Sequence, residues 1–281
     1  MKTKIFTALM AAFVFTGAFI LIACNRGGSS SSSALSEVTA APYTIEVGGS
    51  TSVTPLMEMF AQEYAKVKPN IKININGTGS GDGITNAGVT YQIGMSSREL
   101  TAAEQGRGLK AEIIAIDGIA VIVNNDNSVS NLTTDQIRSI YTGEITNWSQ
   151  VGGGSAPIAL ISREAGSGTR GAFEEIIGFA GKLAAGANES TSTGAIKAGI
   201  AQNPNAIGYI SLGSLDNTIK ALLVGGAAAT SANVVNGSYT VARPFIVLTG
   251  NNAHAETTAF VQWILSAAGQ AIVRSSWIPV N

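Results

Sequence analysis

Residues 158–177 hold the side chains of this chain that are best suited to bind an anion. Arg163 follows a short apolar run typical of a buried strand, and the turn Gly166-Ser167-Gly168-Thr169 comes soon after it. Apolar residues then recur at helical spacing up to Ile177, which predicts a helix beginning at the turn. The first backbone N–H groups of a helix have no partner within it and lie at the positive end of its dipole. With two hydroxyls and a guanidinium, they predict a site for a tetrahedral oxyanion.

Three other interpretations of this turn stay open. It can be an ordinary Ser/Gly loop in which Thr169 caps the helix. Gly166, Gly168 and Gly171 also match the G-x-G-x-x-G fingerprint of dinucleotide-binding proteins. We expect no strand within about thirty residues after it, however, where the ribose-binding acid belongs. Ser167 as a nucleophile would need glycines two residues away on each side, and here they are adjacent to it.

Similar junctions upstream favour the anion site. A strand expected over residues 44–47 is followed by Gly, Ser and Thr residues, and alternating isoleucines at 71–75 lead into a second glycine-rich segment. Residues 91–98 predict a short strand that ends on Ser96, Ser97 and Arg98. Glycines allow the backbone to approach a ligand closely. We call residues 48–52, 77–83, 96–98 and 166–169 the first, second, third and fourth loops.

The first 23 residues predict an export signal, because Lys2 and Lys4 precede an almost wholly apolar run. The sequence Leu-Ile-Ala-Cys at 21–24 resembles the bacterial lipobox, in which the cysteine is lipidated and becomes the mature N-terminus. Cys24 is the only cysteine, so no disulfide can form within the chain. Residues 24–42 include a run of serines and predict a flexible tether. We therefore expect an extracytoplasmic protein, lipid-anchored to the bacterial cell membrane.

Composition limits the partners. The chain is 45% hydrophobic and 12% charged, and the part from Tyr43 onward is long enough for one large or two smaller domains. Without Lys2 and Lys4 the sequence has 15 basic and 18 acidic residues, a net charge near −3. This balance predicts no nucleic-acid groove, and a bound anion must be attracted by local groups.

The sequence has few of the residues that catalysis or metal binding would need. His254 is the only histidine, and it lies in a polar turn where we expect it to cap the last helix. A hydrolytic triad needs a base, and a metal site needs several clustered ligands. We predict a binding protein with no enzymatic activity, metal or cofactor. A phosphatase or hydrolase acting through a Ser/Gly loop is the alternative from a different class, and turnover of p-nitrophenyl phosphate would reveal it.

The motifs of the four loops, G-S-T, G-x-G-S-G, I-G-M-S-S-R and S-R-x-x-G-S-G-T, occur in this order. With D-G-I-A-V-I-V-N from Asp117 and A-I-G-Y-I from Ala206, the set resembles the phosphate-binding component of the phosphate-specific ABC transporter. The resemblance extends from Tyr43 to the C-terminus and implies an α/β, two-lobed, type II periplasmic-binding-protein fold.

This resemblance also implies how the protein is organised. Two mostly parallel sheets would be joined by a two-strand hinge, with inorganic phosphate held between the lobes. Lobe one would comprise residues 43–118 and 248–281, and lobe two residues 119–247. An ABC permease would be the partner, and we expect a monomer. Sulfate, molybdate or tungstate are alternative ligands.

The ligand residues that the resemblance implies are Thr51, Ser52, Ser80, Ser97, Arg163, Ser167, Gly168 and Thr169. Two positions depart from many family members. Gln92 replaces an Asp, and Ser97 stands where many members carry the Asp that accepts the proton of hydrogen phosphate. Arg98 follows and is expected to add a second positive charge. We hypothesise that Asp117 supplies the acceptor and steadies Arg98. Asp82, which we expect to cap a helix, is the second candidate.

The remaining pattern predicts structural elements. Pro55 lies in the first turn of a helix that stops before Pro69, and Trp148 is expected in the core. Further helices are expected from 132, over 194–202 and over 255–272, and further strands over 207–210, 220–224 and 239–249.

Overall fold

The computed structural model describes residues 41–281. The predicted export signal, Cys24 and nearly all of the predicted tether lie outside the described residues. In chain order the elements are β1 (Tyr43–Gly49), α1 (Thr54–Val67), β2 (Ile71–Gly77), α2 (Ser80–Asn86), β3 (Ile93–Ser96), α3 (Ala102–Gln105), β4 (Lys110–Val123), β5 (Asn131–Leu132), α4 (Thr134–Thr142), η1 (Trp148–Val151), β6 (Ala159–Arg163), α5 (Gly168–Ile177), β7 (Asn188–Ser190), α6 (Thr193–Gln202), β8 (Ala206–Ser211), η2 (Leu212–Ser214), β9 (Lys220–Ala221), β10 (Leu223–Val224), α7 (Ser231–Val235), β11 (Ala242–Thr249), α8 (Ala255–Leu265) and α9 (Ala267–Val273).

Local sequence signals explain the bounds of several elements. Pro55 stands in the first turn of α1, where a missing N–H costs nothing, and the helix ends before Pro69. Leu56, Phe60 and Tyr64 are buried along one face of α1. The expected helices from 132 and over 194–202, the strand over 207–210 and the burial of Trp148 are also confirmed.

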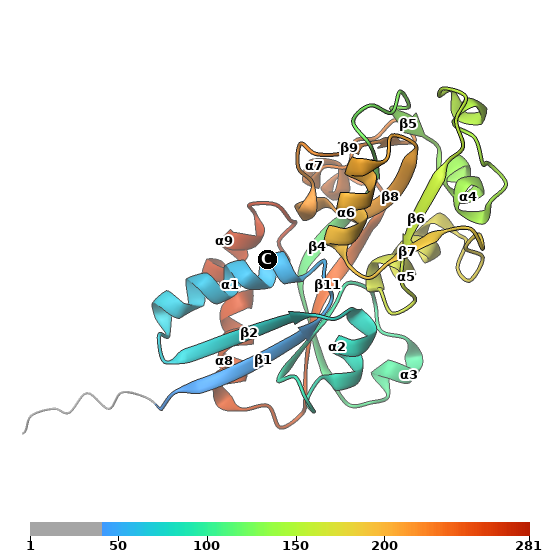
Figure 1. Ribbon diagram of the computed structural model, residues 1–281. Helices are drawn as coiled ribbons and strands as arrows, with labels where there is room; N and C mark the ends of the chain where they lie inside the picture. Colours follow the sequence, from blue (N-terminus) through green and yellow to red (C-terminus); the bar gives the residue numbers. More distant parts are fainter. Residues whose placement is uncertain (1–40) are drawn as a thin grey trace, which may run out of the picture. The chain divides into compact units, whose positions relative to one another are not determined.

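The main sheet has two parallel parts connected by antiparallel strands. Its order is β2-β1-β3-β11-β4-β8-β6-β7, and β9 pairs with β4. The pairs β1–β2, β1–β3, β6–β7 and β6–β8 are parallel, whereas β4 and β11 pair antiparallel with each other and with β8 and β3. Figure 1 shows β4 and β11 side by side between the two parts. The expected two-lobed α/β fold is confirmed, with the two sheets hydrogen-bonded through β4 and β11 into one strand path.

Two hydrophobic clusters form the main core. One joins β1, α1, β3, β11, α8 and α9, with Phe60, Phe245 and Phe260 fully buried in it. The other joins the end of β4 with α4, β6, α5, α6 and β8, and Phe173 and Tyr209 pack within it at a ring distance of 4.2 Å. Both clusters include residues of β4, and otherwise each takes its strand residues chiefly from one part of the sheet, so each part packs on its own core.

Two expected elements are interrupted. The helix expected over 255–272 is divided into α8 and α9, because Ser266 donates its Oγ proton to Trp263 O at 2.6 Å and ends α8. A side chain at Gly269 would lie 2.3 Å from Ile264 O, so the close turn between the helices requires glycine there. The strand expected over 220–224 is two strands, β9 and β10, which pair with β4 and β5.

Two short strands, β5 and β7, escaped sequence analysis. β7 follows the fourth loop within the span where we expected none, and it pairs parallel with β6. Its sequence, Asn-Glu-Ser, lacks the apolar residues that predict a strand, which is why pattern analysis missed it. Its acidic residue, Glu189, is bonded to Arg170 at 2.9 Å, so its carboxylate is engaged within the protein.

Candidate functional site

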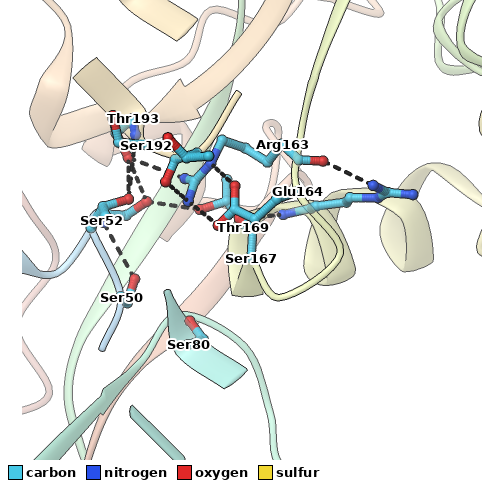
Figure 2. A network of polar contacts seen from close by, with 12 residues as sticks. Ser50, Ser52, Ser80, Arg163, Glu164, Ser167, Thr169, Ser192 and Thr193 are labelled. Carbon is cyan, nitrogen blue, oxygen red and sulfur yellow. Dashed lines mark hydrogen bonds and ion pairs between the residues drawn. The ribbon is translucent and has the colours of Figure 1, made fainter. Parts of the chain in front are cut away.

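Four polar loops meet where strands of the sheet end. The first, second and third loops contain the carboxyl ends of β1, β2 and β3, respectively. In the first part of the sheet, β1 pairs parallel with both β2 and β3. The fourth loop connects β6 to α5. Carboxyl ends of parallel strands lie at one edge of a sheet, so loops distant in sequence come together there. Figure 2 shows side chains of the first and fourth loops turned toward one another, with Ser80 of the second loop nearby.

Within the first three loops, serine hydroxyls bond to one another. Ser50 Oγ donates to Ser97 Oγ at 2.9 Å, and Ser80 Oγ lies 3.3 Å from Ser97 Oγ. The backbone N–H of Ser97 donates to Ser80 Oγ at 3.1 Å. All three side chains are buried. A hydroxyl both donates and accepts, so this group can turn its protons toward a bound oxyanion.

The fourth loop contacts the first and second loops. Ser52 Oγ lies 2.7 Å from Thr169 Oγ1, and Gly81 N donates to Gly166 O at 3.0 Å. A side chain at Gly168 would lie 2.3 Å from Ser80 Oγ, so only glycine allows this approach. Ser52 follows β1, in one part of the sheet, and Thr169 follows β6, in the other part. Their contact is therefore one of the links between the two lobes.

The start of α5 points its first turn at this meeting place. Ser167, not Thr169, is the N-cap, and its Oγ accepts from Arg170 N at 3.3 Å. Gly168 and Thr169 form the first helical positions, where backbone N–H groups lack helical acceptors. The expected strand–turn–helix arrangement is therefore present, and its N-cap lies two residues before Thr169, the cap in the alternative interpretation.

Arg163 is held rigidly beside these loops. Its side chain is only 2% exposed, and Nε and Nη2 donate to the two carboxylate oxygens of Glu164, both at 2.8 Å. The N–H of Arg163 donates to the hydroxyl of Tyr209 at 3.2 Å. Burial raises the pKa of Tyr209 to about 12, so its phenol stays protonated. Figure 2 shows the guanidinium turned toward Thr193 and the fourth loop.

Arg98 does not take the place expected for a second cation. Its guanidinium donates to both oxygens of Glu104, at 2.7 and 2.8 Å, and to Glu99 O. This hydrogen-bonded pair lowers the pKa of Glu104 to about 2. The stem of Arg98 packs against Gly171, where an added side chain would lie 3.2 Å from Arg98 Cδ. The positive charge of Arg98, which we expected to face the anion, is therefore compensated by the carboxylate of Glu104.

The expectation that Asp117 steadies Arg98 is wrong, because the partner of Asp117 is Arg243. Asp117 Oδ2 accepts from Arg243 Nη2 at 3.0 Å and from Nε at 3.2 Å, and Oδ1 accepts from Ser211 Oγ at 2.8 Å. Burial raises the pKa of Asp117, while Arg243 and Ser211 act in the opposite direction. Arg243 also donates to Ser97 O at 3.1 Å, so it contacts the third loop directly.

The second candidate acceptor, Asp82, is also engaged. It lies inside α2 rather than at its cap, and the N-cap position belongs to Gly79. Its carboxylate accepts from Thr78 Oγ1 at 2.6 Å, Asn86 Nδ2 at 2.7 Å and the Tyr91 hydroxyl at 2.9 Å. These bonds, chiefly that of Thr78, lower the pKa of Asp82. Asp82 thus fixes the second loop to α2 and to Tyr91.

Sequence analysis missed three residues that contact the site. Arg243 lies in a strand that the sequence predicts, but it was not considered as a site residue. An arginine inside an apolar strand indicates a buried acidic partner, which could have drawn attention to it. Tyr209 belongs to the quoted A-I-G-Y-I motif, but nothing in the sequence linked its hydroxyl to Arg163. Thr193 begins α6 and contacts Thr51 and Ser52, a relation that depends on the missed strand β7.

Outside the four loops, the single histidine has a structural role. His254 caps α8, accepting from Glu256 N at 3.2 Å, as predicted. Among residues 41–281, no group of three or more His, Cys, Asp or Glu side chains could hold a metal ion. No helix in that range has both the length and the apolar character needed to cross a bilayer.

Known proteins are similar to this chain in sequence and structure. The family of PBP superfamily domains matches residues 32–268. Phosphate-binding protein PstS of Borreliella burgdorferi is 30% identical over 244 residues, covering 82% of this chain and 87% of that protein. Phosphate-binding protein PstS of Bacillus subtilis is 32% identical over 244 residues, covering 83% of this chain and 78% of that protein.

Two crystal structures have a similar fold. One is assigned as a phosphate ABC transporter substrate-binding protein from Clostridium perfringens, with bound phosphate. It is 45% identical with a TM-score of 0.83, covering 85% of this chain and 100% of that one. The other is an ABC-type phosphate transport receptor from Vibrio cholerae. It is 36% identical with a TM-score of 0.69, covering 83% of this chain and 99% of that one.

Proposed function

This chain belongs to the PBP superfamily, with PstS phosphate-binding proteins among its relatives, and from that membership we propose that it captures inorganic phosphate outside the cytoplasm for an ABC transporter. A membrane permease would accept the ion from it, so the protein would act by binding and release, without catalysis. The relatives named for phosphate binding and the crystal structure with bound phosphate support this choice of ion.

The phosphate would lie where the four loops meet. Its donors would be the hydroxyls of Thr51, Ser52, Ser80, Ser97, Ser167 and Thr169, the backbone N–H groups of Gly168 and Thr169, and the guanidinium of Arg163. Asp117 and Arg98 would not contact the ion directly. Asp117 is bonded to Arg243, and both Nη atoms of Arg98 donate to Glu104, whereas Arg163 directs Nη1 to Thr193, beside Ser52. A site made mainly of neutral dipoles suits a protein whose net charge is slightly negative.

One contact carries the proposal, the 2.7 Å approach of Ser52 Oγ and Thr169 Oγ1. It brings the first loop against the helix start at which the sequence predicts an oxyanion site. A phosphate held there would be bound by both lobes at once, so binding would favour their closure about β4 and β11. We propose lobe boundaries near residues 118 and 248, with one monomer per ion.

Calorimetric titration of the chain without its export signal tests the proposed function. Phosphate should bind with a stoichiometry of one, and sulfate and molybdate should bind more weakly. A chain that binds sulfate or molybdate in preference to phosphate would overturn the assignment of the ion. Hydrolysis of p-nitrophenyl phosphate would instead overturn the transport role.

Preference between phosphate and sulfate depends on the side chain at position 97, which here is a serine hydroxyl. Phosphate and sulfate differ by one proton, and a fixed acceptor would reject sulfate. A serine can turn to suit either ion. A general oxyanion binder is therefore the second candidate, and competition between the two ions decides between them.

Attachment to the membrane is a separate proposal. Cys24 would carry the lipid, and acylation by more than one chain would give stable anchoring. Cys24→Ser should be exported but released from the membrane fraction. If the variant resists carbonate washing, the apolar run before Cys24 is retained and the lipid anchor is not required.

A further inference from the structure

The hydroxyl of Thr193 lies among residues of the proposed phosphate site. Thr193 Oγ1 is 3.1 Å from Ser52 Oγ and 3.2 Å from Thr51 Oγ1. Arg163 Nη1 donates to the same oxygen at 3.4 Å. The backbone N–H of Thr193 also donates to Thr51 Oγ1, at 3.3 Å. Thr193 is only 7% exposed, and Figure 2 shows it facing Ser52 and the guanidinium of Arg163.

Strand pairing explains why Thr193 reaches this place. β7 lies parallel to β6, with Ser190 opposite Arg163, so the segments that follow the two strands leave from the same edge. Ser192 then caps α6 by accepting from Ala195 N at 3.1 Å. The cap fixes the direction of the first helical turn. Thr193, the next residue, is thereby presented to the first loop.

The chemistry of a hydroxyl limits how these contacts can be shared. Threonine offers one proton and two lone pairs, and arginine can only donate. Arg163 therefore uses one lone pair of Thr193, which leaves one proton and one lone pair for Thr51 and Ser52. Ser52 continues to Thr169 at 2.7 Å. The guanidinium and four hydroxyls thus form a connected network in which a change of proton direction at one member affects the others.

We propose that Thr193 is a further phosphate-binding residue, which acts with Thr51 and Ser52 to hold the ion between the lobes. This inference rests on the proposed function. Thr51 and Ser52 follow β1, in the first part of the sheet, whereas α6 packs its Ile196 and Ile200 into the second hydrophobic cluster. A hydroxyl that joins the two lobes at the ion favours the bound arrangement, so its loss should speed the release of phosphate.

Three variants of the chain without its export signal separate binding from helix stability. Thr193→Val keeps the shape of the side chain and removes the hydroxyl, whereas Thr193→Ser keeps the hydroxyl. Ser192→Ala is the matched control, since Ser192 caps the same helix without a hydrogen bond to the first loop. Phosphate affinity is measured by calorimetry, the release rate by stopped flow, and stability by thermal unfolding without ligand.

Thr193→Val should raise the Kd for phosphate roughly three- to thirtyfold, the range expected for losing one buried hydrogen-bonding group. Most of this should be a faster release rate. Thr193→Ser should stay within about threefold of the wild type. Ser192→Ala should lower the melting temperature and leave the Kd unchanged. If the valine variant does not fold, Thr193→Ala takes its place with the same expectation.

Other outcomes contradict the inference. A wild-type Kd in Thr193→Val would overturn it, and so would equal losses of affinity in Thr193→Val and Ser192→Ala, which would show that Thr193 acts through the stability of α6. A wild type that fails to bind phosphate would overturn the proposed function itself. Titration of the wild type reveals that failure before any variant is made, so failure of the proposed function is distinguished from failure of the inference about Thr193.

Discussion

Arg243 and Asp117 are direct partners across strands β11 and β4, and their side chains form an ion pair that is 1% and 0% exposed. The pair is connected at both ends. Asp117 accepts from Ser211 at the end of β8, and Arg243 donates to the backbone of Ser97 in the third loop. A buried charge pair on the two strands that cross between the lobes therefore positions one wall of the proposed site.

Breaking this pair should destabilise the protein strongly. Removing one partner of a buried ion pair costs about 3–5 kcal/mol, because the other charge stays buried without compensation. Arg243→Gln and Asp117→Asn should each show this loss in urea unfolding, and the double variant should lose less than the sum. Lys66→Gln is the control, because its partner Glu63 is largely exposed and such pairs contribute less than about 1 kcal/mol. Additive losses in the double variant would contradict the pairing.

The hypothesis that Asp117 accepts the proton of the ligand leads to a different expectation once its partners are known. Its two oxygens accept from Ser211 and twice from Arg243, and both of these partners lie outside the four loops. Asp117→Asn should therefore lower stability and leave the ratio of phosphate to sulfate affinity unchanged. Competition calorimetry measures the ratio. A tenfold gain in relative sulfate affinity would restore Asp117 as the acceptor.

Replacement of Arg163 by lysine should weaken phosphate binding although the charge is retained. Lysine cannot reproduce the two-pronged bond to Glu164 together with the contact to Thr193. Hydrogen bonds to charged groups contribute about 1.5–3 kcal/mol, so we expect a loss of roughly ten- to a hundredfold in affinity. Arg98→Lys serves as the control, since Arg98 bonds to Glu104. Equal effects of the two substitutions in calorimetry would remove the special role of Arg163.

The Arg98–Glu104 pair predicts a pH dependence of stability. The pair lowers the pKa of Glu104 from 4.5 to about 2, so folding favours the ionised carboxylate. Its contribution is then fully present above pH 4.5 and is lost as the pH falls toward 2. Glu104→Gln should lower the melting temperature at neutral pH, and the difference from the wild type should shrink below pH 4.5. A difference that stays constant down to pH 2.5 would contradict this assignment.

Several features could be predicted from sequence because local rules determine them. Helix α1 begins at Pro55 and ends before Pro69, and His254 caps α8, since each depends on neighbours along the chain. The turn at 166–169 was recognised as a helix start because its glycines and hydroxyls precede a helical apolar pattern. The two-lobed fold was predicted through the family resemblance that the four loop motifs carry, and each of these motifs lies at or just after the end of a strand.

What the sequence could not decide was which charge faces which. We expected Asp117 to steady Arg98, yet Arg98 bonds to Glu104, six residues away, and Asp117 bonds to Arg243 on a strand 126 residues later. Thr193 likewise reaches the first loop only because the short polar strand β7 pairs with β6. Spacing along a chain determines the faces of helices and strands, whereas ion pairs and hydroxyl networks depend on strand order and register. Those are decided by burial of the whole sheet, so only the tertiary structure assigns these partners.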